Sequence, residues 1–108
     1  MMTLIRPFGP TPGSSTANIA VTASNQTISV PISGIGFQSI RAVNLGTRTI
    51  FIEFGKDNST TPTAATSTSI PMLPNSAEVF ILPPDCSTLA VISDGTGNTL
   101  YLTVGQGV

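Results

Sequence analysis

The stretch TLAVIS-DGTGN-TLYLTV, residues 88–104, carries the pattern that decides the fold. In its second half, Leu100, Leu102 and Val104 alternate with Thr and Tyr, which is typical of a strand with one buried and one solvated face. Residues 93–98 contain glycines that allow positive φ angles, so they predict the loop of a hairpin. The stretch therefore predicts two antiparallel strands that follow one another along the chain.

Similar β-favouring runs, separated by turn residues, occur along the chain from residue 19 onward, and no helical segment competes with them. The other runs are IAVTA (19–23), TISVPI (27–32), SIRAVNL (39–45), TIFIEF (49–54), TSIPML (68–73) and AEVFIL (77–82). Short strands at regular spacing are typical of sandwiches and barrels. The predicted fold class is all-β: an antiparallel β-sandwich or jelly-roll-like barrel of about eight short strands.

The chain of 108 residues has the size of one domain and begins with a segment of different composition. Residues 1–18 are rich in proline, glycine and serine, which form neither a helix interior nor a central strand. We therefore expect an extended N-terminal arm over residues 1–18 and a single β-sandwich domain over residues 19–108.

The run TIFIEF is apolar on both of its faces. Ile50, Ile52 and Phe54 share one face, while Phe51 lies beside Glu53 on the other. Either a loop of the same chain covers the second face, or that face contacts another subunit.

The run AEVFIL raises the same question, because Phe80 and Leu82 share a face with Glu78. We expect this second face and the arm to supply contacts with other subunits or with a capsid. The candidate contact residues are Arg6, Pro7, Phe8, Phe51, Phe80 and Leu82.

Two local features are expected near the turn that follows the run SIRAVNL. Residues 44–47 predict a tight link between two adjacent antiparallel strands. Arg48 and Glu53 are expected to form a surface ion pair, which would contribute at most ~1 kcal/mol.

The residues that usually carry catalysis are scarce. The chain has no histidine, which removes Ser-His-Asp and Cys-His nucleophiles and zinc sites that contain histidine. Cys86, the single cysteine, is expected to be a buried small hydrophobic residue. The five carboxylates show no pairing or spacing typical of a glycosidase or a calcium loop. We therefore predict a protein that is not an enzyme and has no cofactor and no metal site.

Charge is also scarce, and this limits the partners. Charged residues make up 8% of the chain, against about 25% in a typical soluble domain. The net charge of −1 offers no footprint for nucleic acid, and no signal peptide or membrane span is expected. Weak charge also means weak repulsion between copies, so we expect the chain to function inside an assembly.

Several motifs between residues 40 and 107 resemble small virion-associated proteins of tailed bacteriophages. The motifs are RAVNLGT (41–47), the pair Phe54-Gly55, PMLPNS (71–76) leading into Glu78-Val79-Phe80, and LYLTVGQG (100–107). The resemblance covers roughly two thirds of the chain and consists of strand and turn motifs. It implies a β-sandwich module that decorates or cements a capsid, or that is built into a tail or fibre.

The resemblance implies a structural virion protein that stabilises the shell by binding neighbouring subunits of the major capsid protein. It implies a homo-oligomer, often a trimer, on the capsid exterior of the virion after synthesis in the host bacterial cytoplasm. The alternative is a tail, vertex or fibre component that binds a host receptor or a carbohydrate. Sugar sites usually expose Trp or Tyr, and this chain has no Trp and only Tyr101, which favours the first alternative.

Overall fold

The structure is a computed structural model that describes residues 9–10, 16–30, 38–55, 62–82 and 86–106. Its strands are β1 (Gly9–Pro10), β2 (Thr16–Val21), β3 (Gln26–Ser29), β4 (Ser39–Leu45), β5 (Ile50–Phe54), β6 (Ile70–Met72), β7 (Ser76–Ile81), β8 (Thr88–Ser93) and β9 (Asn98–Gln106). Each of the predicted runs overlaps a strand, and two of the runs coincide with β4 and β8. The predicted all-β sandwich is confirmed.

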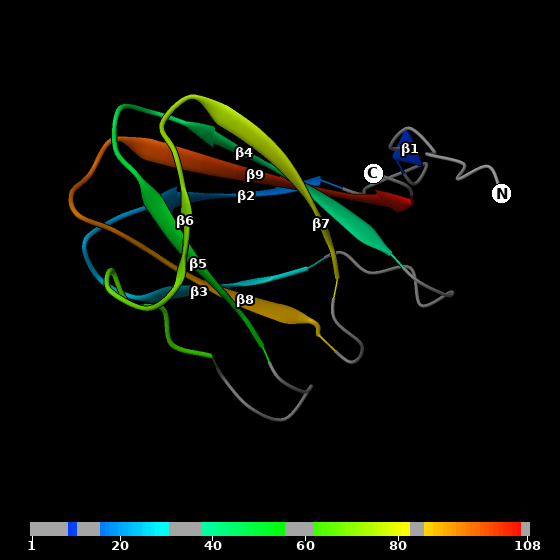
Figure 1. Ribbon diagram of the computed structural model, residues 1–108, viewed down its shortest axis with the longest axis horizontal. Helices are drawn as coiled ribbons and strands as arrows, with labels where there is room; N and C mark the ends of the chain where they lie inside the picture. Colours follow the sequence, from blue (N-terminus) through cyan, green and yellow to red (C-terminus); the bar gives the residue numbers. More distant parts are fainter. Residues whose placement is uncertain (1–8, 11–15, 31–37, 56–61, 83–85, 107–108) are drawn as a thin grey trace, which may run out of the picture.

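The strands form two antiparallel sheets that face each other (Figure 1). In sheet A the order is β2-β9-β4-β7, and β1 pairs with the same strand β9 beyond the end of β2. In sheet B the order is β3-β8-β5-β6. The side chains that point between the two sheets form the core.

The connectivity is that of a jelly roll. Strands β2, β3, β4 and β5 pair in turn with β9, β8, β7 and β6, so the chain is a long antiparallel ribbon folded over on itself. Every connection from β2 to β9 passes from one sheet to the other, except the connection between β5 and β6. This is the double-sheet arrangement that a jelly roll requires.

This topology corrects two local predictions. The chain turns at residues 46–49 and 94–97, within or next to the predicted turns, but each turn links strands that lie in different sheets. The strands on either side of each turn therefore do not pair with each other as a hairpin would. A turn that crosses between sheets can use the same residue types as a hairpin turn. Gly97, for example, has the expected positive φ of 97°.

The start of the domain lies earlier in the chain than the run IAVTA. Strand β2 begins at Thr16, within the region predicted as an arm. Gly9 and Pro10 pair with Gln106 and Gly105 at the end of β9, where β1 is visible in Figure 1. The remaining residues of the predicted arm lie outside the described residues.

The core consists of the inward-facing side chains of both sheets, as the alternation in the sequence predicts. Ile50 and Ile52 on β5 are 0% and 1% exposed, and Cys86 is buried as expected. The full core cluster is Val21, Val30, Ile40, Ala42, Ile50, Ile52, Met72, Leu82, Cys86, Leu89, Val91, Leu100, Leu102 and Val104.

The two faces of β7 are reversed relative to the prediction. Phe80 lies opposite Ile40 of β4, points inward and packs edge-to-face on Phe54, with ring centroids 5.6 Å apart. Leu82 is 7% exposed and belongs to the core, whereas Ile81 is 66% exposed. Pairing with β4 determines this orientation. The β7 residues that lie opposite the buried side chains of β4 face the core as well.

Candidate interaction surface

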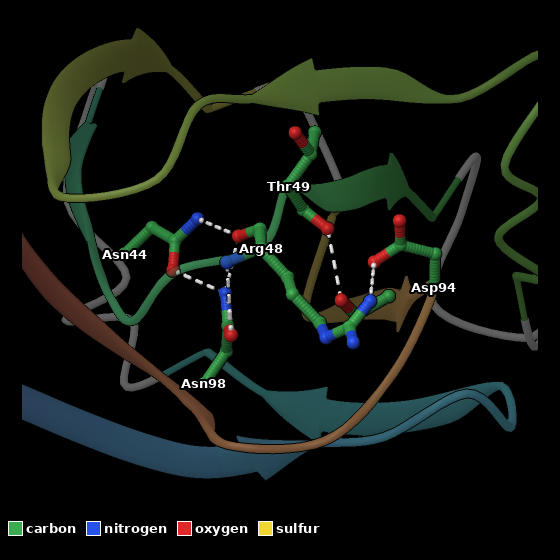
Figure 2. Close-up of polar contacts among 6 residues, drawn as sticks. Asn44, Arg48, Thr49, Asp94 and Asn98 are labelled. Carbon is green, nitrogen blue, oxygen red and sulfur yellow. Dashed lines mark hydrogen bonds and ion pairs between the residues drawn. The ribbon is translucent and has the colours of Figure 1, made fainter.

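A buried pair of asparagines holds together the turns at one end of the sandwich (Figure 2). The side-chain Nδ2 of Asn44 donates to the carbonyl oxygens of Arg48, Met72 and Leu73 at 3.0, 3.1 and 3.1 Å. Asn98 donates from its Nδ2 to Asn44 Oδ1 at 2.9 Å. The pair thus connects the turn after β4, the turn after β6 and the start of β9.

The same pair fixes the backbone of Arg48. Arg48 N donates to Asn98 Oδ1 at 3.3 Å, and Asn98 Nδ2 donates to the carbonyl oxygen of Arg48. A side chain at Gly46 would collide with this arrangement, because a Cβ there would lie 2.5 Å from Asn98 Cγ. Glycine is therefore required at this position for close packing. The network is structural, since its amide groups are occupied by one another and by the backbone.

The side chain of Arg48 extends to the surface and pairs with Asp94, with Nη1 and Oδ1 3.3 Å apart. The predicted pairing of Arg48 with Glu53 is wrong, because the turn sequences that meet here are those after β4 and β8. Both side chains are about half exposed, at 48% and 62%, so the ion pair contributes at most ~1 kcal/mol.

The outer side of sheet B is contacted by a loop of the same chain, residues 62–69. Ser69 Oγ donates to Glu53 Oε1 at 3.0 Å, and Ala64 N donates to Asn25 Oδ1 at 2.7 Å. Ala64 and Ala90 are 4% and 0% exposed although neither belongs to the central core cluster. Of the two explanations for an apolar second face of TIFIEF, a loop of the same chain therefore applies where this loop contacts Glu53.

The outer side of sheet A presents a different surface, which we call the neutral face. Its members are the outward-facing residues Asn18, Ala20, Arg41, Val43, Leu45, Ala77, Val79, Ile81, Thr99, Tyr101 and Thr103. Leu45, Ile81 and Tyr101 are 50%, 66% and 38% exposed. Arg41 is the one charged residue among these members.

Cross-strand pairing places the apolar members of the neutral face side by side. Val43 on β4 lies opposite Tyr101 on β9 and opposite Ala77 on β7. Val79 lies opposite Arg41, two residues further along each strand on the same face. The neutral face is thus a continuous surface over four strands, in which apolar and uncharged polar side chains surround one guanidinium group.

The candidate contact residues from the sequence do not gather at one place. Phe51 is half-buried on the outer side of sheet B, opposite Pro71 and Ile92, whereas Phe80 and Leu82 point into the core. Contacts of these residues with another chain stay a prediction. Arg6, Pro7 and Phe8 lie outside the described residues.

The neutral face itself was missed by the sequence analysis. In SIRAVNL the inward residues include Asn44 and the outward residues include Val43 and Leu45, so the hydrophobic pattern does not separate the two faces. The exposed side of β7 was missed for the same reason. The only available signal was the scarcity of charge along β4, β7 and β9.

Within the described residues, no three His, Cys, Asp or Glu side chains lie close enough together to hold a metal ion. In the same part of the chain, no helix has the length and hydropathy needed to span a membrane.

No protein-family model matches the sequence, and no curated protein matches it significantly. A search of solved structures found similarity to the coat protein of tobacco streak virus, with a TM-score of 0.37 and 8% sequence identity. That match covers 88% of this chain and 89% of the coat-protein chain. The jelly-roll topology of this chain follows from its own strand pairings.

Proposed function

We propose that this protein is a structural component of a virus particle, a capsid decoration protein that attaches to neighbouring coat subunits through the neutral face. The observation that carries the proposal is the exposure of Leu45, Ile81 and Tyr101 on one side of sheet A, with Arg41 as the only charge. Contiguous apolar surface rimmed by polar groups is typical of protein interaction sites.

Three further features support this role. Jelly rolls are frequent in viral capsids, although lectins and cupins use them too. The low charge of the chain keeps the repulsion between many copies on one shell weak. The sequence motifs resemble those of tailed-phage virion proteins. The proposed partner is therefore the major capsid protein, and the proposed location of this chain is the capsid exterior.

The proposal is tested first by counting copies. Quantitative mass spectrometry of purified particles should find this chain at a copy number comparable to that of the coat protein. A handful of copies per particle would contradict decoration and favour a tail or vertex position.

The neutral face is tested by Tyr101→Lys, which places a charge at an exposed position between Asn18 and Val43. Tyrosines that become buried on binding often contribute most of the affinity of an interface. We therefore expect binding to undecorated capsids to weaken by about tenfold or more. Thr27→Lys is the matched control, since Thr27 is exposed on sheet B. Equal binding of the two variants would show that the neutral face is not the attachment surface.

Exposure of Tyr101 also supports a second candidate, a tail, vertex or fibre component that binds a carbohydrate. An exposed aromatic ring flanked by Asn18 and by threonines could stack on a sugar ring. Saturable binding on a glycan array, lost in Tyr101→Ala, would favour this candidate over decoration.

A further inference from the structure

Strand β7 forms one edge of sheet A, and β4 is its only ladder partner among the described residues. The register with β4 runs from Ser76 opposite Asn44 to Ile81 opposite Ser39. Within the described part of the chain, the side of β7 that faces away from β4 is therefore a free strand edge; Figure 1 labels the strand.

One backbone hydrogen bond determines which groups point out of this edge. Leu82 N donates to the carbonyl oxygen of Gln38 at 2.8 Å, in line with the register of β4 and β7. Residue pairs in an antiparallel ladder alternate between hydrogen-bonded and non-hydrogen-bonded. Besides Leu82, the β7 residues whose backbone groups bond to β4 are therefore Phe80, Glu78 and Ser76. The N–H and C=O groups of Ala77, Val79 and Ile81 consequently point outward.

Among the devices that prevent strands from pairing with other chains, this edge carries one charged residue, Glu78. Proteins protect edges with proline, charged side chains, bulges or very short strands. Strand β6 has only 3 residues and contains Pro71, whereas β7 has 6 residues and neither Pro nor Lys. Next to its outward N–H and C=O groups, β7 also carries the exposed apolar side chain of Ile81.

We propose that the free edge of β7 pairs antiparallel with the same edge of a second copy of this chain, around a two-fold axis at Val79. In this register Ala77 bonds to Ile81 of the second copy, and the two Val79 residues bond to each other. Every residue of β7 whose backbone N–H and C=O groups point toward the free edge then has a hydrogen-bonding partner. Sheet A and the neutral face become continuous across the dimer.

Charge selects this register and makes a second copy a suitable occupant. Glu78 is the only charged residue of β7, and pairing centred on Val79 places it opposite Phe80 of the second copy. A register centred on Glu78 would oppose two carboxylates, which is unfavourable. A chain with net charge −1 is also weakly repelled by its own copy.

The pairing has a definite stoichiometry. A two-fold contact uses the same patch on both partners and closes at two copies. The inference therefore differs from the trimer that the family resemblance implies. It concerns the isolated chain in solution, so it is tested separately from attachment to a capsid.

The test combines sedimentation velocity with amide hydrogen exchange on the purified chain. We expect a species of twice the 11.1 kDa mass of one chain at high concentration. On association, exchange should slow at the amides of Ala77, Val79 and Ile81. A monomer up to about 1 mM, the weak end of specific association, would overturn the proposal. Slower exchange on β2, at the other edge of sheet A, would overturn it as well.

Val79→Pro is the decisive variant. The N–H that proline lacks is the one that Val79 directs toward the free edge, so no bond to β4 is lost. Proline is tolerated on edge strands, and we expect dimerisation to weaken at least about tenfold. If Val79→Pro fails to fold, Val79→Lys places a charge on the same axis. Thr27→Lys is the control on the other sheet, because Thr27 is exposed on β3, and it should dimerise normally. A dimer that survives both Val79 variants would refute pairing through β7.

Discussion

At the residue scale, the Asn44 side chain has the largest predicted effect on stability. It is 0% exposed and donates to three backbone carbonyl oxygens. Asn44→Ala leaves those oxygens and Asn98 Nδ2 with fewer partners inside the protein. Each unsatisfied buried group costs about 1–3 kcal/mol, so we expect a loss on the order of 3 kcal/mol. Urea unfolding measures this loss.

Asn18→Ala is the matched control, because Asn18 is exposed on β2. Its free energy of unfolding should change by no more than about 0.5 kcal/mol. If Asn44→Ala were equally mild, water would replace the buried amide without penalty, and the turns would not depend on the pair.

The sequence could not reveal this role of Asn44. In RAVNLGT, asparagine next to Leu45 and Gly46 is typical of a turn, and a turn does follow. The partners that make Asn44 structural lie far away in the chain, at sequence separations of 28 for Met72 and 54 for Asn98. Residue types therefore predicted the position of the turn but not the network inside it.

At the element scale, strand positions were predictable, whereas the inward face of β7 was not. Alternation in TLYLTV is strict, so the inward side of Leu100 and Leu102 is confirmed. In AEVFIL, both phases place apolar residues inward, and only pairing with β4 distinguishes them. The sheet assignment of β4 and β5 also depends on long-range pairing, which local turn signals do not contain.

The loop over residues 62–69 supplies the element-scale prediction. Ser69 Oγ accepts from Ala65 N at 2.9 Å and donates to Glu53 at 3.0 Å, so it fastens this loop to β5. Ser69→Ala should cost about 1 kcal/mol. Because the loss is local, amide exchange should accelerate at Ala64 and Ala65 by about fivefold while the core is unchanged. Hydrogen exchange read by NMR measures both.

Ser67→Ala is the control in the same loop, because Ser67 is exposed. It should leave exchange at Ala65 as in the unmodified chain. Uniform acceleration across β5 and β8 in Ser69→Ala would mean that the loop unfolds together with the whole sandwich.

At the scale of the whole molecule, the N-terminal segment and the neutral face belong to the same sheet. Strand β1 pairs with Gly105 and Gln106 of β9, on the edge of sheet A that β2 also occupies. The described part of the chain therefore begins beside the sheet that carries the neutral face, and residues 1–8 precede it in the sequence.

Deleting residues 1–8 tests whether this segment contributes to attachment. All described strands, including β1, remain in the shortened chain, so we expect its thermal midpoint to shift by no more than about 2 °C. Binding to undecorated capsids should weaken, because the apolar side chains of Leu4, Ile5 and Phe8 are lost. Combined with Tyr101→Lys, the deletion should weaken binding further. Unchanged binding by the shortened chain would remove residues 1–8 from the interface and leave attachment to the neutral face.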